Sequence, residues 1–588
     1  MVRNLLSSFF LTLLMLAPVR FAMPQTSDSP ASAAKPQPET VIRSSARLVQ
    51  MSVVVEDKKG NPVSGLKQED FTVLDEGQPQ RIAFFSAQAL ETAPPAARLL
   101  PPNVCTNRYD LKGEQPPGAV TVVLFDALNT SPEDQSYVRK EVIHFLESVQ
   151  PQDHVAVYGL TTQLFVLHEF TRDSADLVAA AHRFAPKELA AFDASHTPDI
   201  DLVSSGADLA WKGLQDAVNN ANREIADLHN ISRVGTTLGA LEAIANHISG
   251  IAGRKNLVWI SGGFPIQIGL PSVGKAGGGG VSNLSDPSTS NRVTRADREV
   301  GTFDDEAKNA AESLNRANIA VYAIDAKGVE LDPRADPSQR GARLTDQIKD
   351  TSGFNRELDS RDSSKLLADR TGGLAFFGSN DIRGAMRKAF DDGRFAYTIG
   401  FYPSHGQWDG KFRKVKIEAK AEGLRLRYRA GYYATPDRTD SKSVIAEAMR
   451  QAANSPLDAT NLSMIVTGKG AENPRAVELH IGIDPKQLLL VDSGDHRKGA
   501  VDLLFLQRNE AGTILAEEKQ HVDLNLEEKQ FQYLAKAAMV LDRHVAIQPQ
   551  TAEMRVVIRD AGSGTLGSVA MPVKALFPAN AGPAGKSD

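Results

Sequence analysis

The segment at residues 119–130, AVTVVLFDALNT, constrains the fold more than any other part of the chain. Apolar and β-branched residues run without a break from Val120 to Phe125, and a carboxylate, Asp126, follows directly. A continuous apolar run of this length predicts a strand that is buried on both faces, as in a parallel sheet covered by helices. We therefore expect Asp126 at the carboxyl end of a central strand, where open α/β sheets bind their ligands.

Helical and strand patterns alternate after this first strand. An amphipathic helix is expected from Pro132, because proline suits a first helical turn and apolar residues then recur on one face. The alternation predicts a doubly wound, mostly parallel sheet with flanking helices over residues 119–393. Two polar stretches, 266–300 and 328–360, lack periodicity and are expected to be loops within this domain. Further elements are expected as strands at 155–160, 164–170, 256–260, 319–325 and 374–377, and as separate helices at 207–228 and 236–251.

The remaining folded parts have strand patterns. Short apolar runs separated by turn residues at 46–91 and 394–435 predict one β-sandwich, into which the α/β domain is inserted. A second all-β module is expected at 456–578. A chain of 588 residues is too long for a single core, so a multi-domain α/β plus all-β protein is the expected fold class.

The amino-terminal residues predict export. A basic residue precedes a short apolar core at 1–22, which is typical of a signal peptide, and the polar, proline-rich segment 23–45 predicts a disordered linker. No later stretch is long and apolar enough to cross a bilayer, so no membrane span is expected after signal removal. The expected location is periplasmic, cell-envelope or extracellular. Cys105 is the single cysteine, so an intrachain disulfide is excluded.

Charge and motifs argue against two functional classes. The formal net charge of −6 disfavours nucleic acid as the main partner. Gly262-Gly263 and Gly372-Gly373 lack the spacing of a phosphate or dinucleotide loop and predict tight turns. No motif pairs a nucleophile with a base, so no catalytic residue is assigned and an enzyme is not expected.

Several phrases of the α/β domain carry a family resemblance. The strand–Asp–helix unit around Asp126 and the order of elements resemble a von Willebrand factor type A domain. GRKNLVWISGGFP at 253–265, TGGLAFF at 371–377 and YTIGFYPS at 397–404 resemble the exported VWFA-related acidobacterial domain proteins. The resemblance covers about residues 45–435 and implies a Rossmann-like type A fold.

The resemblance also implies a candidate metal site. Type A domains hold a divalent cation with Asp-x-Ser-x-Ser after the first strand, a threonine from a second loop and an aspartate after the fourth strand. Asp126, Thr130 and Thr236 match three of these five ligands, and Ser261 lies near the fourth strand's end. Leu128 and Gly262 stand where the first serine and the last aspartate belong. Such a degenerate metal-ion-dependent adhesion site implies weak Mg²⁺ binding, and the alternative is that Asp126 bonds to its own loop.

These observations lead to three functional hypotheses. The first is an exported interaction or adhesion module that binds an unidentified protein at the top of the type A domain, with Mg²⁺ as the candidate cofactor. The second is an envelope or secretion scaffold in which this site is inert. The third is a hydrolase.

Overall fold

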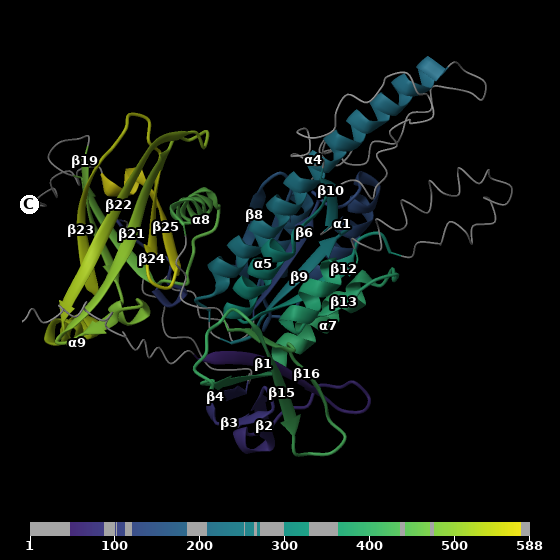
Figure 1. Cartoon of the computed structure of the whole chain (residues 1–588), viewed down its shortest axis with the longest axis horizontal. Helices are drawn as coiled ribbons and strands as arrows, with labels where there is room; N and C mark the ends of the chain where they lie inside the picture. Colours follow the sequence, from purple (N-terminus) through teal and green to yellow (C-terminus); the bar gives the residue numbers. More distant parts are fainter. Residues whose placement is uncertain are drawn as a thin grey trace, which may run out of the picture. The chain divides into compact units, whose positions relative to one another are not determined.

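The computed structural model describes residues 48–87, 100–101, 103–111, 120–184, 209–251, 253–263, 267–270, 299–328, 361, 363–434, 441–470 and 476–577 (Figure 1). The predicted signal peptide and linker, and most of the predicted loops 266–300 and 328–360, lie outside these residues. At the two ends of the first loop, β10 (Gln267–Leu270) and β11 (Glu299–Thr302) form an antiparallel ribbon. None of the described helices combines the length and apolar character that crossing a bilayer requires.

A six-stranded mixed sheet positions the candidate site. Its order is β13-β12-β9-β6-β7-β8, in which β8 is antiparallel and the other neighbours are parallel. Counted along the chain, this order is 3-2-1-4-5-6, so the winding reverses between β6 and β9. The strands are β6 (Val120–Asp126), β7 (His154–Leu160), β8 (Leu164–Thr171), β9 (Lys255–Ser261), β12 (Ile319–Asp325) and β13 (Leu374–Phe376).

Helices cover both faces of this sheet, which explains the unbroken apolar run in β6. Val122 and Leu124 pack into the core formed with α4 (Leu209–Ile248) and α5 (Asp304–Arg316). Val123 and Phe125 point to the opposite core. Successive strand residues face opposite sides, so the positions of β6 from Val122 to Phe125 all carry apolar side chains. The second core is formed with α1 (Pro132–Leu146), α2 (Ser174–Arg183) and α7 (Ile382–Arg394).

Helix α4 differs from the sequence prediction. The structure has one continuous helix from Leu209 to Ile248 in place of two helices separated by a loop. Gly235 lies inside it, and no atom outside its own helix comes within 4 Å of the place a Cβ would take. A glycine in a helix costs about 1 kcal/mol, and the buried face of Val234, Leu238 and Leu241 continues through this position.

The strands before and after the α/β part share two sheets. One has the order β16-β1-β14-β4 and the other β17-β15-β2-β3. Val49 of β1 pairs with Phe401 of β14, and Phe71 of β2 pairs with Ala419 of β15. Residues from both segments therefore form one core. The elements are β1 (Val49–Glu56), η1 (Gln68–Asp70), β2 (Phe71–Asp75), β3 (Gln78–Gln80), β4 (Ile82–Ala87), β14 (Ala396–Phe401), β15 (Phe412–Ala419), β16 (Arg425–Arg427) and β17 (Gly431–Tyr433).

The carboxy-terminal module also consists of two antiparallel sheets around one core. One has the order β23-β19-β18-β5, and the other has β20-β21-β24-β25 with β22 on β21. β5 (Val104–Thr106) lies within residues 92–118, a proline-rich stretch that the sequence predicts to be a linker, and it carries Cys105. The predicted combination of an α/β part with all-β parts is confirmed. The remaining elements are η2 (Tyr109–Leu111), α8 (Lys442–Asn454), β18 (Met464–Gly470), β19 (Ala476–Ile483), η6 (Pro485–Gln487), β20 (Val491–Ser493), β21 (His496–Arg508), β22 (Ile514–Glu527), α9 (Glu528–Ala537), β23 (Met539–Ala546), β24 (Glu553–Asp560), β25 (Leu566–Pro572) and α10 (Val573–Leu576).

The end of α4 is bonded to Thr460, which lies between α8 and β18. The Thr460 backbone N–H donates to Asn246 O at 2.9 Å, and its hydroxyl donates to His247 O at 2.6 Å. The same hydroxyl accepts from Gly250 N at 2.8 Å. Thr460 thus satisfies carbonyls that the last turn of a helix leaves without partners.

Candidate functional site

Asp126 lies at the carboxyl end of β6, beside the point where the winding of the sheet reverses. This is the place that the sequence predicts. The carboxylate does not face solvent, however, because the residue is only 2% exposed. Its chemistry is therefore decided by the groups that surround it.

Four donors saturate the Asp126 carboxylate. Oδ1 accepts from the Asn129 backbone N–H at 3.0 Å, and Oδ2 accepts from the Asn129 side-chain amide at 2.8 Å. Oδ2 also accepts from the Trp259 indole N–H at 3.0 Å and from the Ser261 hydroxyl at 2.8 Å. A buried carboxylate with this set of donors is a structural acceptor rather than an open ligand.

Asn129 connects this carboxylate to helix α4. The Arg233 guanidinium donates from Nε and Nη2 to Asn129 Oδ1 at 3.2 and 3.0 Å. The Asn129 amide also donates to the Thr237 hydroxyl at 2.7 Å. Arg233 and Thr237 are 4% and 0% exposed, so the helix and the strand end meet in a buried polar network. We call Asp126, Asn129, Arg233, Thr237 and Ser261, with the Trp259 indole, the strand-end network.

Opposing effects act on the two charged groups of this network. Burial raises the pKa of the Asp126 carboxyl, while its hydrogen bonds to Asn129, Ser261 and Trp259 lower it. Burial lowers the pKa of the Arg233 guanidinium to about 10, and the Asp126 charge opposes that shift. Arg233 stays charged at neutral pH and supplies a positive charge beside the carboxylate. The Arg233 guanidinium thus supplies a positive charge near Asp126, where the resemblance to type A domains implies a divalent cation.

Thr130 also bonds within the loop. Its hydroxyl donates to Asp126 O at 2.6 Å and accepts from Gly262 N at 3.1 Å. Gly262 itself lies against this loop, since a Cβ there would come within 2.5 Å of Asn129 O. The aspartate that type A domains have at this position would need the loop to move.

The three proposed metal ligands are therefore not arranged as a coordination site. Both Asp126 oxygens and the Thr130 hydroxyl are engaged, and Thr236 is half-buried one position before Thr237, the hydroxyl that joins the network. Leu128 is buried in the apolar core. Hard cations require several free oxygen ligands, so the residues present do not fit Mg²⁺. In the part of the chain that the structure describes, no group of three or more histidine, cysteine or acidic side chains could hold a metal ion.

Sequence reasoning missed Asn129, Trp259, Arg233 and Thr237 as a connected set. Trp259 offered a usable signal, because a buried indole N–H needs an acceptor and the strand predicted at 256–260 belongs to the same predicted sheet as the strand that ends in an acid. Arg233 offered none from spacing alone. It was expected between two helices, in a loop that the structure does not have.

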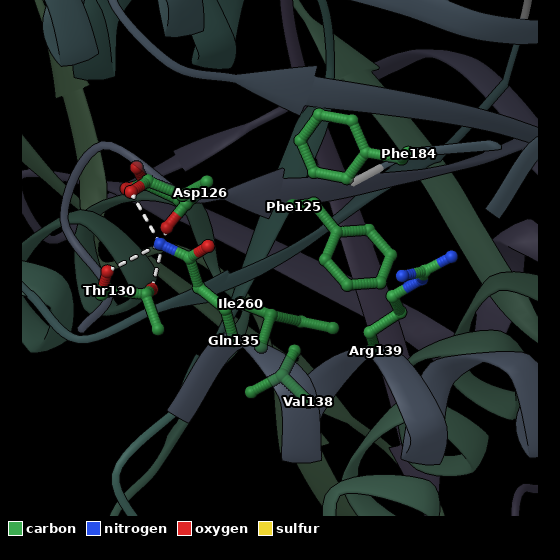
Figure 2. A pocket seen from close by; sticks show the side chains of 9 residues that line it. Phe125, Asp126, Thr130, Gln135, Val138, Arg139, Phe184 and Ile260 are labelled. Atoms are coloured by element: carbon green, nitrogen blue, oxygen red, sulfur yellow. Dashed lines mark hydrogen bonds between the residues drawn. The ribbon is translucent and has the colours of Figure 1, made fainter. Parts of the chain in front are cut away.

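A small apolar hollow of about 280 Å³ lies between the end of β6 and α1, next to Asp126 (Figure 2). Phe125, Val138, Phe184 and Ile260 line it. Gln135 points toward the loop and donates to Ala127 O and Thr130 O. The Arg139 guanidinium, also at the rim, donates to backbone carbonyls of Ala181 and His182. The polar side chains here hold the backbone in place, and the hollow presents mainly aromatic and aliphatic surface.

Asp325, at the end of β12, forms a second carboxylate–arginine pair along this edge. Its Oδ2 lies 3.2 Å from Arg361 Nε, and the Asp325 side chain is 4% exposed. Both residues line a smaller hollow with Ser364 and Phe377. Two acids at the carboxyl edge are thus each accompanied by an arginine.

No family model matches the sequence, and no curated protein matches it. Several solved structures align with parts of the chain. An aerotolerance-related membrane protein from Bacteroides fragilis NCTC 9343 has 12% identity and a TM-score of 0.22, covering 46% of this chain and 98% of its own. The pilus adhesin SpaC from Lactobacillus rhamnosus GG has 11% identity and a TM-score of 0.21, covering 86% of this chain and 59% of its own. Three N-terminal domains of the type V pili tip protein Mfa5 from Porphyromonas gingivalis have 8% identity and a TM-score of 0.24, and the alignment covers 84% of this chain and 77% of theirs. Scores this low carry no argument about fold or function.

Proposed function

We propose that this chain is an exported, non-enzymatic interaction protein that recognises a protein partner at the carboxyl edge of its six-stranded sheet. The sheet is assigned to the von Willebrand factor type A fold, which the strand order and the antiparallel edge strand support. Recognition does not depend on a metal, because the strand-end network already fills the place where a cation would bind.

The observation that carries this proposal is the length of α4. Arg233 and Thr237 meet Asn129 beside the carboxyl end of β6, and the helix ends at Ile248, shortly before β9 begins at Lys255. α4 therefore runs antiparallel to the strands, and residues 209–232 continue past the carboxyl edge. At 1.5 Å per residue this projecting half is about 36 Å long, and Figure 1 shows it continuing beyond the strands.

The projecting half presents apolar side chains to solvent. Leu214, Ile225 and Leu228 are 51%, 50% and 62% exposed. Among residues 214–230, none of the side chains that the structure describes belongs to the buried core of the sheet. Exposed apolar side chains gathered on one element mark interaction sites, and an amphipathic helix face is a common mode of protein recognition.

The strand-end network has a positioning part in this function. Asn129 and Arg233 tie the middle of α4 to the end of β6 through buried hydrogen bonds. A helix that continues into solvent needs such an anchor where it leaves the core. The competing proposals are a scaffold in which the projecting half binds nothing and a hydrolase; turnover in a hydrolase screen would support the last.

The test is capture of partners from the native cell envelope with the mature protein. Leu228→Glu places a charge at the most exposed of these three apolar positions and is expected to remove the captured proteins. Tyr533→Glu, on α9 and 71% exposed, is the matched control and should capture as the unmodified protein does. Addition of EDTA should change nothing. If Leu228→Glu captures the same proteins as the control, the proposed recognition surface is wrong.

A further inference from the structure

Five residues of the projecting half form one continuous line along α4. We define the apolar stripe as Leu214, Ala217, Ala221, Ile225 and Leu228, all of which are exposed. Their spacing of three, four, four and three residues places them on a single helix face. The opposite face is different, since Asn219 is 8% exposed and Arg233 belongs to the strand-end network. The stripe is thus a face of α4 whose apolar side chains are exposed among the residues that the structure describes.

The order of side-chain sizes along the stripe is nearly the same in both directions. Read forward it is Leu-Ala-Ala-Ile-Leu, and read backward it is Leu-Ile-Ala-Ala-Leu. Two copies placed antiparallel about Ala221 bring Leu214 against Leu228 of the other copy. Ile225 then meets Ala217, and the two Ala221 residues meet at the centre. A large side chain faces a small one in the inner layers, which is what close helix packing requires.

We propose that the occupant of the apolar stripe is the same stripe of a second copy of this chain, in an antiparallel, two-fold symmetric pair. This inference rests on the proposed function and names its partner. Self-complementary faces related by a two-fold axis are the commonest way in which identical chains associate. Because the stripe is complementary to itself, the pair needs no other binding surface on the chain.

Charge selects the antiparallel arrangement. Glu224 is exposed beside the stripe. In a parallel pair it would face Glu224 of the other copy, and like charges at a helix interface are unfavourable. In the antiparallel pair it lies opposite Val218, three residues on the other side of Ala221.

The experiment combines sedimentation with cysteine cross-linking in full-length mature protein that carries Cys105→Ala. The sedimentation coefficient of the parent is expected to rise with concentration, and Leu228→Glu should abolish the rise. Ala221→Cys is expected to form a disulfide-linked dimer under mild oxidation, because this position lies on the two-fold axis. Leu214→Cys alone should not cross-link, whereas an equal mixture of Leu214→Cys and Leu228→Cys should give a mixed dimer.

The outcomes separate this inference from the proposed function. A parent that sediments as a monomer at every concentration overturns the second copy as occupant, while loss of envelope capture by Leu228→Glu would still support the interaction surface. Efficient cross-linking of Leu214→Cys to itself indicates a parallel pair and overturns the two-fold arrangement. Tyr533→Glu serves again as the charge control and should sediment as the parent does.

Discussion

Removal of the Asp126 carboxylate tests the strand-end network most directly. In Asp126→Ala, the donors of Asn129, Trp259 and Ser261 lose their common acceptor. Two of the four donor groups keep one other hydrogen bond. The Ser261 hydroxyl still accepts from Gly263 N, and the Asn129 amide still donates to Thr237, but each loses the acceptor of the proton that it donates to Asp126. The Trp259 indole N–H and the Asn129 backbone N–H lose the Asp126 oxygens to which they donate.

The expected loss in the free energy of unfolding follows from the removal of these hydrogen bonds and of the negative charge beside Arg233. A buried donor left without a partner costs about 1–3 kcal/mol, and Trp259 is 0% exposed. A buried cation that loses its countercharge adds to this cost. We expect Asp126→Ala to lower the free energy of unfolding by about 3–6 kcal/mol, a large part of the 5–15 kcal/mol typical of native proteins.

Urea unfolding followed by tryptophan fluorescence measures this cost, because Trp259 reports from inside the network. Glu133→Ala is the matched control, since Glu133 is an exposed acid in the first turn of α1 and its loss should cost less than about 1 kcal/mol. A metal site predicts the reverse pattern, with Asp126→Ala as stable as the parent in EDTA. A loss below about 1 kcal/mol for Asp126→Ala would refute the reasoning.

Three further predictions concern other parts of the structure. Burial lowers the pKa of Lys255 to about 7, below its usual value of 10.5, so the unfolded chain binds more protons between these values. The free energy of unfolding should therefore rise with pH from 7 to 10 by up to about 1.4 kcal/mol per pH unit, and chemical denaturation should show no such rise for Lys255→Met. Thr460→Val should lower the free energy of unfolding by about 1 kcal/mol, since it removes the hydroxyl that donates to His247 O at the carboxyl end of α4; an unchanged melting curve would contradict that role. Titration with millimolar Mg²⁺ should leave the fluorescence of Trp259 unchanged, and a saturable change would show that a cation enters the strand-end network.

The sequence was most informative where one physical requirement dominates. The continuous apolar run predicted β6 with its end at Asp126, because a strand buried on both faces needs an apolar residue at each position. Ser261 was placed near this acid by the type A resemblance, and the structure brings the two together because adjacent parallel strands end at the same edge. The first prediction depends only on local composition and on strand geometry.

The partners of Asp126 depend on contacts between distant residues, which periodicity does not encode. Gly235-Thr236-Thr237 has the composition of a turn, yet the buried face continues through it and keeps α4 helical. That continuity shifts the inward hydroxyl from Thr236 to Thr237 and brings Arg233 to Asn129. The resemblance to type A domains predicted where the site lies. It did not predict that the Asn129 amide and the Arg233 guanidinium would lie there in place of a cation and its ligands.

The hydrogen bonds of Thr460 have a mechanical consequence for α4. This single rod carries the apolar stripe near one end, the Arg233 anchor in its middle and the Thr460 contact at the other. Force applied at the apolar stripe is transmitted along the continuous helix to its end at Ile248, which is hydrogen-bonded to residues 458–461. Force applied by a partner is therefore shared between the end of β6 and the segment that leads into the last module.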